Sequence, residues 1–271
     1  MYKFEYHRPN TLVEALDLLA QDDDAKLLAG GQTLLPTLRQ RLAAPSALVD
    51  LAGVSELTGI GAKEGLLSIG AMTRYIEIIE SPLVQAKLPS LSRAVALVGD
   101  PLVRNRGTIG GSLANNDPTA DLTAAVLAMN ATLVTDRRSI TADEFFVDLF
   151  ETALEQGEIL VRIEFPLPSR AAYLKFRNPA SRYAIVGVFV AETCGGVRVA
   201  VTGARAKVFR EHAFEAALQA EFSPQAVKGL EVETTGLIDD LHASAEYRAN
   251  LISVLARRAV SAAMTEPNQG A

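Results

Sequence analysis

The chain contains few of the residues that bind metals or form covalent cross-links. Its 271 residues include a single cysteine, Cys194, and three histidines without metal-ligand spacing, His7, His212 and His242. One cysteine cannot form a disulfide within the chain, and it cannot by itself hold a structural zinc ion or an iron–sulfur cluster. We therefore expect no metal site in this chain, and a redox cofactor of its own would be organic.

An excess of positive charge and a long apolar run are also missing. The formal net charge is -6, so the chain lacks the basic surface typical of nucleic-acid-binding proteins. Its longest apolar stretches, residues 122–129 and 184–191, fall well short of the roughly 20 residues that span a bilayer. The N-terminal residues alternate like a strand and contain no signal-peptide core. We expect a cytoplasmic protein with no membrane span and no nucleic-acid partner.

Apolar and polar residues follow an alternating helix and strand pattern. Thr11 with Glu14 is typical of a capping box, which predicts a helix through residues 12–19. Further helices are expected at residues 33–41, 89–98 and 121–129. Strands are expected at residues 26–28, 47–51, 66–69, 131–135 and 159–165. A first subdomain is predicted to end near Gly53.

Pro166 and Pro168 indicate a domain boundary. Beyond them we expect strands at residues 173–177, 184–192 and 197–202, with a turn at residues 194–196 and helices at 210–220 and 244–263. The predicted fold class is α+β. We expect residues 1–167 to form one domain, with subdomains of about 1–53 and 54–167, and residues 168–271 to form a second α+β domain with a small antiparallel sheet.

Two short glycine segments carry the strongest functional signal. The first is Ala29-Gly30-Gly31-Gln32-Thr33-Leu34, and the second is Thr108-Ile109-Gly110-Gly111-Ser112. Each joins two glycines to a small hydroxyl residue, so that backbone N–H groups can turn outward and a phosphate can approach closely. We interpret both as loops that clamp a pyrophosphate.

The common nucleotide motifs do not account for these segments. Gly59-Ile60-Gly61 is followed by Glu64, where the dinucleotide-binding fingerprint requires a third glycine, and no G-x-x-x-x-G-K-[ST] loop occurs. The interpretation that remains is a phosphate site built from the backbone amides of the two glycine segments. Asp121 stands at a predicted helix start, where it either caps the helix or accepts hydrogen bonds from ribose or ribityl hydroxyls.

Three segments, in order, resemble the FAD-binding medium subunit of the molybdenum hydroxylases, the family of xanthine dehydrogenase and aerobic carbon monoxide dehydrogenase. They are residues 29–36, 69–73 and 104–112, followed by Asp117-Pro118-x-x-Asp121. The resemblance covers nearly the whole chain, including Gly157-Glu158-Ile159-Leu160 and residues 175–184. It implies a two-subdomain, PCMH-type FAD domain followed by a C-terminal α+β domain.

The resemblance also implies roles for individual residues. The backbone amides of the two glycine segments would hold the pyrophosphate and ribityl oxygens, and Asp121 would bind hydroxyls. Leu160 matches a position beside the adenine, and Tyr183 matches the segment beside the isoalloxazine ring. A basic position near the flavin falls on Arg177 or Lys175. The choice between them stays open, because Asn178-Pro179 departs from the commonest pattern of the family. The residues expected to contact FAD are Ala29, Gly30, Gly31, Gln32, Thr33, Leu34, Thr108, Ile109, Gly110, Gly111, Ser112, Asp121, Leu160, Lys175, Arg177 and Tyr183.

The implied function is electron transfer. FAD in this chain would pass electrons from the 2Fe–2S clusters of a small partner subunit to a final acceptor, while a large partner subunit would carry the molybdenum cofactor, in a dimer of heterotrimers. No catalytic residue is predicted here. The substrate and the acceptor (oxygen, NAD, a quinone or a cytochrome) stay open.

Two other functions remain as alternatives. A self-sufficient FAD-dependent oxidase or dehydrogenase is disfavoured by the short C-terminal module and the isolated histidines. A flavin-free scaffold subunit is disfavoured by the intact glycine segments.

Overall fold

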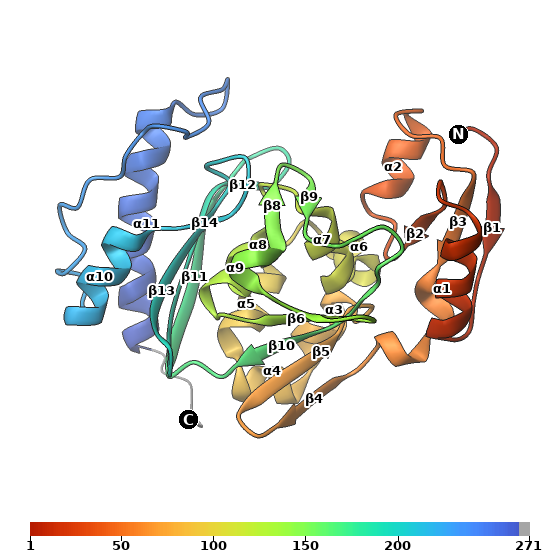
Figure 1. Cartoon of the computed structure of the whole chain (residues 1–271). Coiled ribbons are helices and arrows are strands. Elements are labelled where there is room, and N and C mark those ends of the chain that lie inside the picture. Colours follow the sequence, from red (N-terminus) through yellow and green to blue (C-terminus); the bar gives the residue numbers. More distant parts are fainter. Residues whose placement is uncertain (266–271) are drawn as a thin grey trace.

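The computed structural model describes residues 1–265, so the last six residues of the predicted 168–271 domain lie outside it. Figure 1 shows three units in chain order, from the red N-terminal unit through the central unit to the blue C-terminal unit. Helices and sheets are mixed in all three units, which confirms the predicted fold class.

The N-terminal unit is a small parallel sheet with strand order β1-β3-β2. Helix α1 begins where predicted, because the Thr11 hydroxyl accepts a hydrogen bond from the Glu14 amide and the Glu14 carboxylate accepts one from the Asn10 amide. The elements are β1 (Glu5–His7), α1 (Leu12–Gln21), β2 (Lys26–Leu28), α2 (Leu34–Arg39), β3 (Ala47–Asp50) and the 3₁₀ turns η1 (Leu51–Gly53) and η2 (Ser55–Leu57).

The central unit is an antiparallel sheet of order β4-β5-β10-β6-β7 with short helices packed against it. Its strands are β4 (Ile60–Lys63), β5 (Leu66–Gly70), β6 (Thr132–Thr135), β7 (Ser139–Thr141), β10 (Leu160–Pro166) and the separate hairpin of β8 (Phe146–Asp148) and β9 (Glu151–Thr152). Its helices are α3 (Tyr75–Glu80), α4 (Pro82–Lys87), α5 (Pro89–Ala96), α6 (Pro101–Arg106), α7 (Ile109–Asn115), α8 (Asp121–Ala128) and α9 (Ala142–Phe145).

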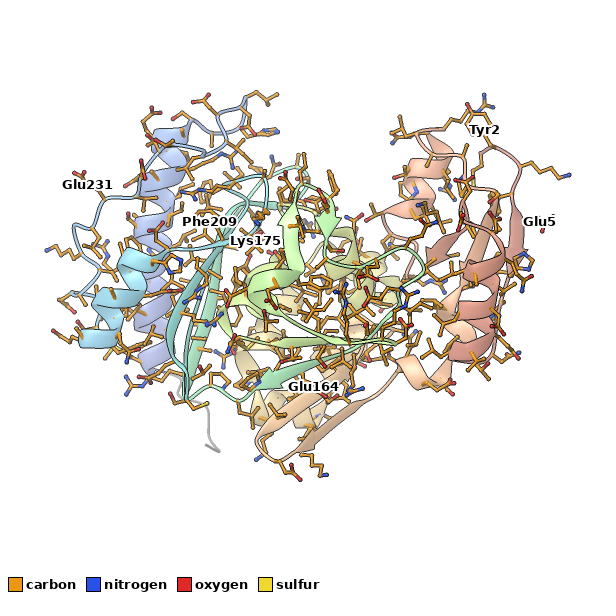
Figure 2. All side chains as sticks on the ribbon, in the orientation of Figure 1. Tyr2, Glu5, Glu164, Lys175, Phe209 and Glu231 are labelled. Atoms are coloured by element: carbon orange, nitrogen blue, oxygen red, sulfur yellow. The ribbon has the colours of Figure 1, made fainter. Side chains whose placement is uncertain are left out.

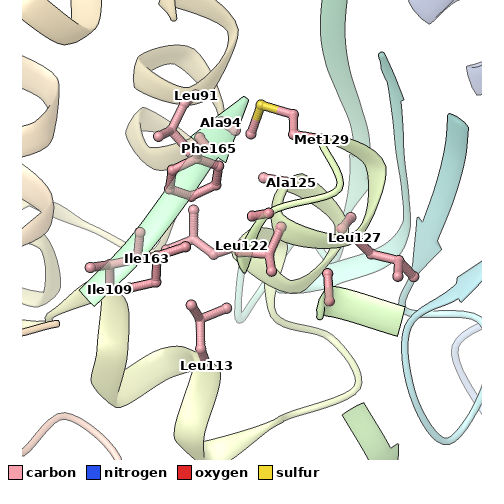
Figure 3. Packing of buried hydrophobic residues seen from close by; sticks show 14 of the residues in the cluster. Leu91, Ala94, Ile109, Leu113, Leu122, Ala125, Leu127, Met129, Ile163 and Phe165 are labelled. Carbon is pink, nitrogen blue, oxygen red and sulfur yellow. The ribbon is translucent and has the colours of Figure 1, made fainter. Parts of the chain in front are cut away.

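Helix α8 lies in the middle of the largest hydrophobic cluster. All of its residues are buried, which is the expected placement of a helix that is apolar on every side. Figure 3 shows Leu122 and Ala125 of α8 among Ile163 and Phe165 of β10 and Leu91 of α5. Helix α8 is therefore the core around which the central unit is assembled.

The C-terminal unit is an antiparallel sheet of order β11-β12-β13-β14 covered on one face by helices, as Figure 1 shows. Alternating residues of the sheet serve two cores. Tyr173 and Phe189 belong to the cluster around α8, whereas Leu174 and Val188 belong to the cluster under the helices. The elements are β11 (Arg170–Arg177), β12 (Ala184–Thr193), β13 (Gly196–Thr202), β14 (Phe209–Arg210), α10 (His212–Ala220) and α11 (Ala245–Thr265).

Residues 1–265 contain neither a membrane-spanning helix nor a metal-binding cluster of side chains. No helix there is long and apolar enough to cross a bilayer. No group of three or more His, Cys, Asp or Glu side chains there is arranged to hold a metal ion.

A buried carboxylate joins β6, the following turn and the segment before β10. Glu158 is 4% exposed and accepts hydrogen bonds from the Thr135 hydroxyl (2.7 Å), the Glu155 amide (2.8 Å) and the Arg138 guanidinium (3.0 Å). Hydrogen bonding by Arg138 is the main cause that lowers the pKa of Glu158 to about 2, against the opposing effect of burial. The charged form is thus stabilised by folding.

We expect Glu158→Gln to lower the free energy of unfolding at pH 7 by about 1–3 kcal/mol, because it removes hydrogen bonds to a charged group. Since the folded pKa lies below the ordinary glutamate value of 4.5, this stabilisation is complete above that pH and is lost as the pH falls towards 2. Urea unfolding at neutral and acidic pH measures the difference. Glu155→Gln is the control, because Glu155 pairs with the same arginine but its side chain is 62% exposed. Equal losses in both variants would contradict the prediction.

Candidate functional site

The first glycine segment presents a row of unused backbone donors. It leaves β2, turns at Gly31 with φ of +71°, and enters α2 through a hydrogen bond from the Leu35 amide to the Gly31 carbonyl. The amides of residues 30–34 donate no hydrogen bond to any group within residues 1–265. Consecutive amides of this kind can surround an anion such as a phosphate.

The second glycine segment is helical, so the prediction of a loop there is wrong. Helix α7 begins at Ile109, and the Thr108 hydroxyl caps it by accepting from the Gly111 amide (3.2 Å). The Ile109 amide donates to the Thr73 carbonyl and the Gly110 amide donates to the Ala71 carbonyl. These amides therefore attach α7 to the segment that follows β5.

The structure brings the two glycine segments into direct contact. A Cβ atom at Gly30 would overlap the carbonyl oxygen of Arg106 and the Cα of Gly107. A Cβ at Gly111 would stand 2.8 Å from the Thr108 hydroxyl and 3.1 Å from the Ala29 methyl group. The missing side chains thus let the N-terminal and central units approach through backbone atoms.

Asp121 faces the C-terminal sheet. It is the first residue of α8, whose N-cap is Ala120, and its carboxylate makes no capping hydrogen bond, so a capping role is excluded. The carboxylate is 6% exposed, with one oxygen accepting from the Lys175 ammonium (2.8 Å) and the other from the Tyr173 phenol. Burial raises the pKa of Asp121, while Lys175 and Tyr173 oppose that rise.

Lys175 connects three parts of the chain. Its side chain is 3% exposed, and its ammonium group also donates to the Leu97 carbonyl (3.0 Å) after α5. Figure 2 labels Lys175 where the C-terminal sheet meets the central unit. Of the two basic candidates, Lys175 is therefore adjacent to Asp121. Arg177 lies at the exposed end of the same strand, and its side chain makes no ion pair or hydrogen bond within residues 1–265.

Tyrosines complete the surroundings of Asp121. Burial raises the pKa of Tyr75 to about 12, opposed in part by a hydrogen bond with Ser112, and a Cβ at Gly107 would overlap the Tyr75 ring. Tyr183 is 52% exposed, and its pKa is raised by burial and by the nearby carboxylates of Asp117 and Asp121.

The predicted residues therefore fall into groups. The first glycine segment meets the start of α7, and Ser112, Asp121, Lys175 and Tyr183 lie in one neighbourhood. Leu160 is buried at the start of β10 and belongs to the central hydrophobic cluster.

Sequence reasoning missed three residues of this region, Tyr75, Gly107 and Tyr173. Tyr173 carried a usable signal, because it stands two residues before Lys175 on a predicted strand and so shares its face. Gly107 lies in the matching segment 104–112, although no site role was predicted for it. Tyr75 carried no signal of comparable strength, since its contact with Gly107 depends on tertiary packing.

Comparison of the sequence with known proteins shows the family to which the chain belongs. Residues 2–168 match the family model described as the FAD binding domain in molybdopterin dehydrogenase. The carbon monoxide dehydrogenase medium chain of Hydrogenophaga pseudoflava is 36% identical over 278 residues, covering 96% of this chain and 97% of that one. The nicotine 6-hydroxylase medium subunit of Paenarthrobacter nicotinovorans is 35% identical, covering 94% of this chain and 95% of that one.

A solved structure of a related protein has the same fold. A structure of the H. pseudoflava carbon monoxide dehydrogenase, in a form lacking the Mo-pyranopterin moiety of its cofactor, superposes with a TM-score of 0.89 at 37% identity. The match covers 97% of this chain and 98% of that one. Fold and site define an FAD-binding oxidoreductase subunit. The chain belongs to the family of FAD-binding medium subunits of molybdenum hydroxylases.

We expect Gly30→Ala to reduce FAD retention at least tenfold, because its methyl group would overlap rigid backbone at Arg106 and Gly107 and push the two units apart. Flavin content after purification and the flavin dissociation constant measure the effect. Gly61→Ala is the matched control, since nothing lies within 4 Å of a Cβ at that position. Full flavin content in Gly30→Ala would show that the close approach is not needed for binding.

Proposed function

We propose that this chain is the FAD-carrying electron-transfer subunit of a multi-subunit molybdenum-containing hydroxylase or dehydrogenase. The observation that carries the proposal is the row of unused amides at residues 30–34. These donors lie against the start of α7, in a chain whose residues 2–168 match an FAD-binding domain.

The residues present fit FAD. In the proposed complex the amides of the first glycine segment bind the pyrophosphate. Helix α7 serves this site mainly by close packing and by the Ser112 hydroxyl, because its first amides are already donated. Asp121 accepts hydrogen bonds from the sugar hydroxyls, and Tyr183 and Arg177 lie towards the flavin ring. The remaining residues expected at FAD, including Leu160 beside the adenine, keep their predicted roles.

Bound FAD supplies a carrier that accepts and releases electrons singly or in pairs. The chain's own residues would hold and orient it, and none is required to transfer a proton. Within the described residues no group of side chains is arranged to hold a metal. We therefore assign the iron–sulfur clusters to a small partner subunit and the molybdenum cofactor to a large one, in a dimer of heterotrimers. A cytoplasmic location stays a prediction.

Substrate choice is assigned to the large partner. Two medium subunits of similar identity to this chain belong to proteins named for very different substrates, carbon monoxide and nicotine. We infer that the medium subunit does not determine the substrate.

We expect the full chain, purified with FAD present during expression, to carry close to one flavin and to show flavin absorption bands. Addition of candidate substrates to the chain alone should leave the flavin oxidised, because the proposed electron source is a partner subunit. Addition of a reduced iron–sulfur partner, obtained by co-expression of the neighbouring genes, should reduce it.

The other outcomes select the alternatives. A folded chain without flavin, also after incubation with excess FAD, would indicate a scaffold subunit. Flavin reduced by an organic substrate without any partner would indicate a self-sufficient dehydrogenase or oxidase.

A further inference from the structure

We propose that Tyr173 is a positioning residue for FAD. Its phenol fixes the Asp121 carboxylate in the orientation that accepts hydrogen bonds from the sugar hydroxyls of the nucleotide. The inference rests on the proposed function, and it adds a residue of the C-terminal sheet that the glycine motifs do not reveal.

The geometry is specific to a phenol at this position. Tyr173 is 6% exposed, and its hydroxyl donates to one oxygen of Asp121 while Lys175 donates to the other. With both oxygens held, the plane of the carboxylate is fixed, and the remaining lone pairs point in set directions.

Two neighbours hold the phenol in place. The Tyr173 ring stacks on Phe189 with ring centroids 5.9 Å apart and an interplanar angle of 25°. The next strand carries Gly187, where any Cβ would overlap the Tyr173 hydroxyl. The ring is therefore supported on one side, and the missing side chain at Gly187 leaves room for the hydroxyl beside Asp121.

The Tyr173 hydroxyl helps to keep the Asp121 carboxylate charged. A buried carboxylate is driven towards its neutral form, and a charged acceptor binds hydroxyl donors more strongly than a neutral one. Burial already raises the pKa of Asp121. Removing the phenol would leave Lys175 as the main stabilising partner, so Asp121 would become protonated at a higher pH.

The tyrosines near Asp121 do not change charge in the range of the test. Tyr75 on α3, Tyr173 on β11 and Tyr183 before β12 all have pKa values raised above 10.0 by burial, so they stay neutral between about pH 5 and 8. Lys175 faces Asp121 from β11, and Asp117 lies near Tyr183. A pH dependence of FAD binding is therefore not expected from these tyrosines, and we expect it from the buried Asp121, whose pKa is raised by burial.

The test compares the FAD dissociation constants of the full-length chain and its variants from about pH 5 to 8, measured by flavin fluorescence. We expect Tyr173→Phe to weaken FAD about tenfold at neutral pH, as loss of a hydrogen bond to a charged group implies. As the pH falls, its affinity should decline at a higher pH than in the wild type. Tyr247→Phe is the matched control, because that tyrosine contacts Phe176 on the other face of the sheet.

A double substitution separates positioning from packing. If Tyr173 acts through Asp121, Tyr173→Phe should add less than a twofold loss in an Asp121→Asn background, where no charge is left to hold. Gly187→Ala gives a second way to break the contact, since its methyl group would displace the phenol while Tyr173 itself remains. It should weaken FAD in the same pH-dependent way.

Several results would overturn the proposal. One is an unchanged affinity and pH profile in Tyr173→Phe while the wild type binds FAD. Another is the same tenfold loss in both the wild-type and Asp121→Asn backgrounds. A third is unfolding of Tyr173→Phe under conditions where Asp121→Asn stays folded, because a residue acting through Asp121 cannot matter more than its charge. A wild-type chain that binds no FAD would instead refute the proposed function, which keeps the two failures distinct.

Discussion

The close approach of two backbones at Gly30 and Gly107 is the constraint on which the site depends. No side chain fits at Gly30, so the turn after β2 rests directly on the segment between α6 and α7. The backbone amides of the two glycine segments differ in their hydrogen bonding. The first keeps its amides unpaired because its turn is held from outside. The second donates the amides of Ile109 and Gly110 to the segment after β5 and so becomes part of the support. Similar motifs thus take different physical roles, one as donor and one as scaffold.

The burial of α8 explains why the C-terminal unit belongs to the same site. A helix that is apolar on all sides needs cover from two directions, and the sheet of β11 to β13 provides one of them. This packing brings the strand that carries Tyr173 and Lys175 against the first turn of α8. Asp121 is the polar residue at that point, and it finds its partners in the covering sheet. The packing of the C-terminal sheet on α8 therefore both buries the helix and brings Tyr173 and Lys175 to Asp121.

Sequence patterns predicted the long helices and strands and singled out the glycine segments. They failed for elements and pairings that depend on tertiary contacts. Strands β10 and β12 and helix α11 were predicted within a few residues because their apolar repeats are long enough to recognise. Helices α3, α4 and α6 span one or two turns and leave no such repeat. Helix α7 has two glycines in its first turn, which disfavour helix, but the Thr108 cap and the carbonyls of Ala71 and Thr73 after β5 outweigh that preference. The pairing of Asp121 with Lys175 joins residues 54 positions apart, which no local pattern encodes.

The ion pair of Asp121 and Lys175 is difficult to explain by stability alone. Both side chains are almost fully buried, and removing two charges from water often costs as much as their attraction returns. The region around this pair is already hydrophobic, and replacing a buried ion pair by well-packed apolar residues is often neutral or stabilising. A buried carboxylate that is nevertheless held in place by an ammonium group and a phenol has a fixed direction and a maintained charge. Those properties suit the binding of a polar ligand, which is the role proposed above for Asp121.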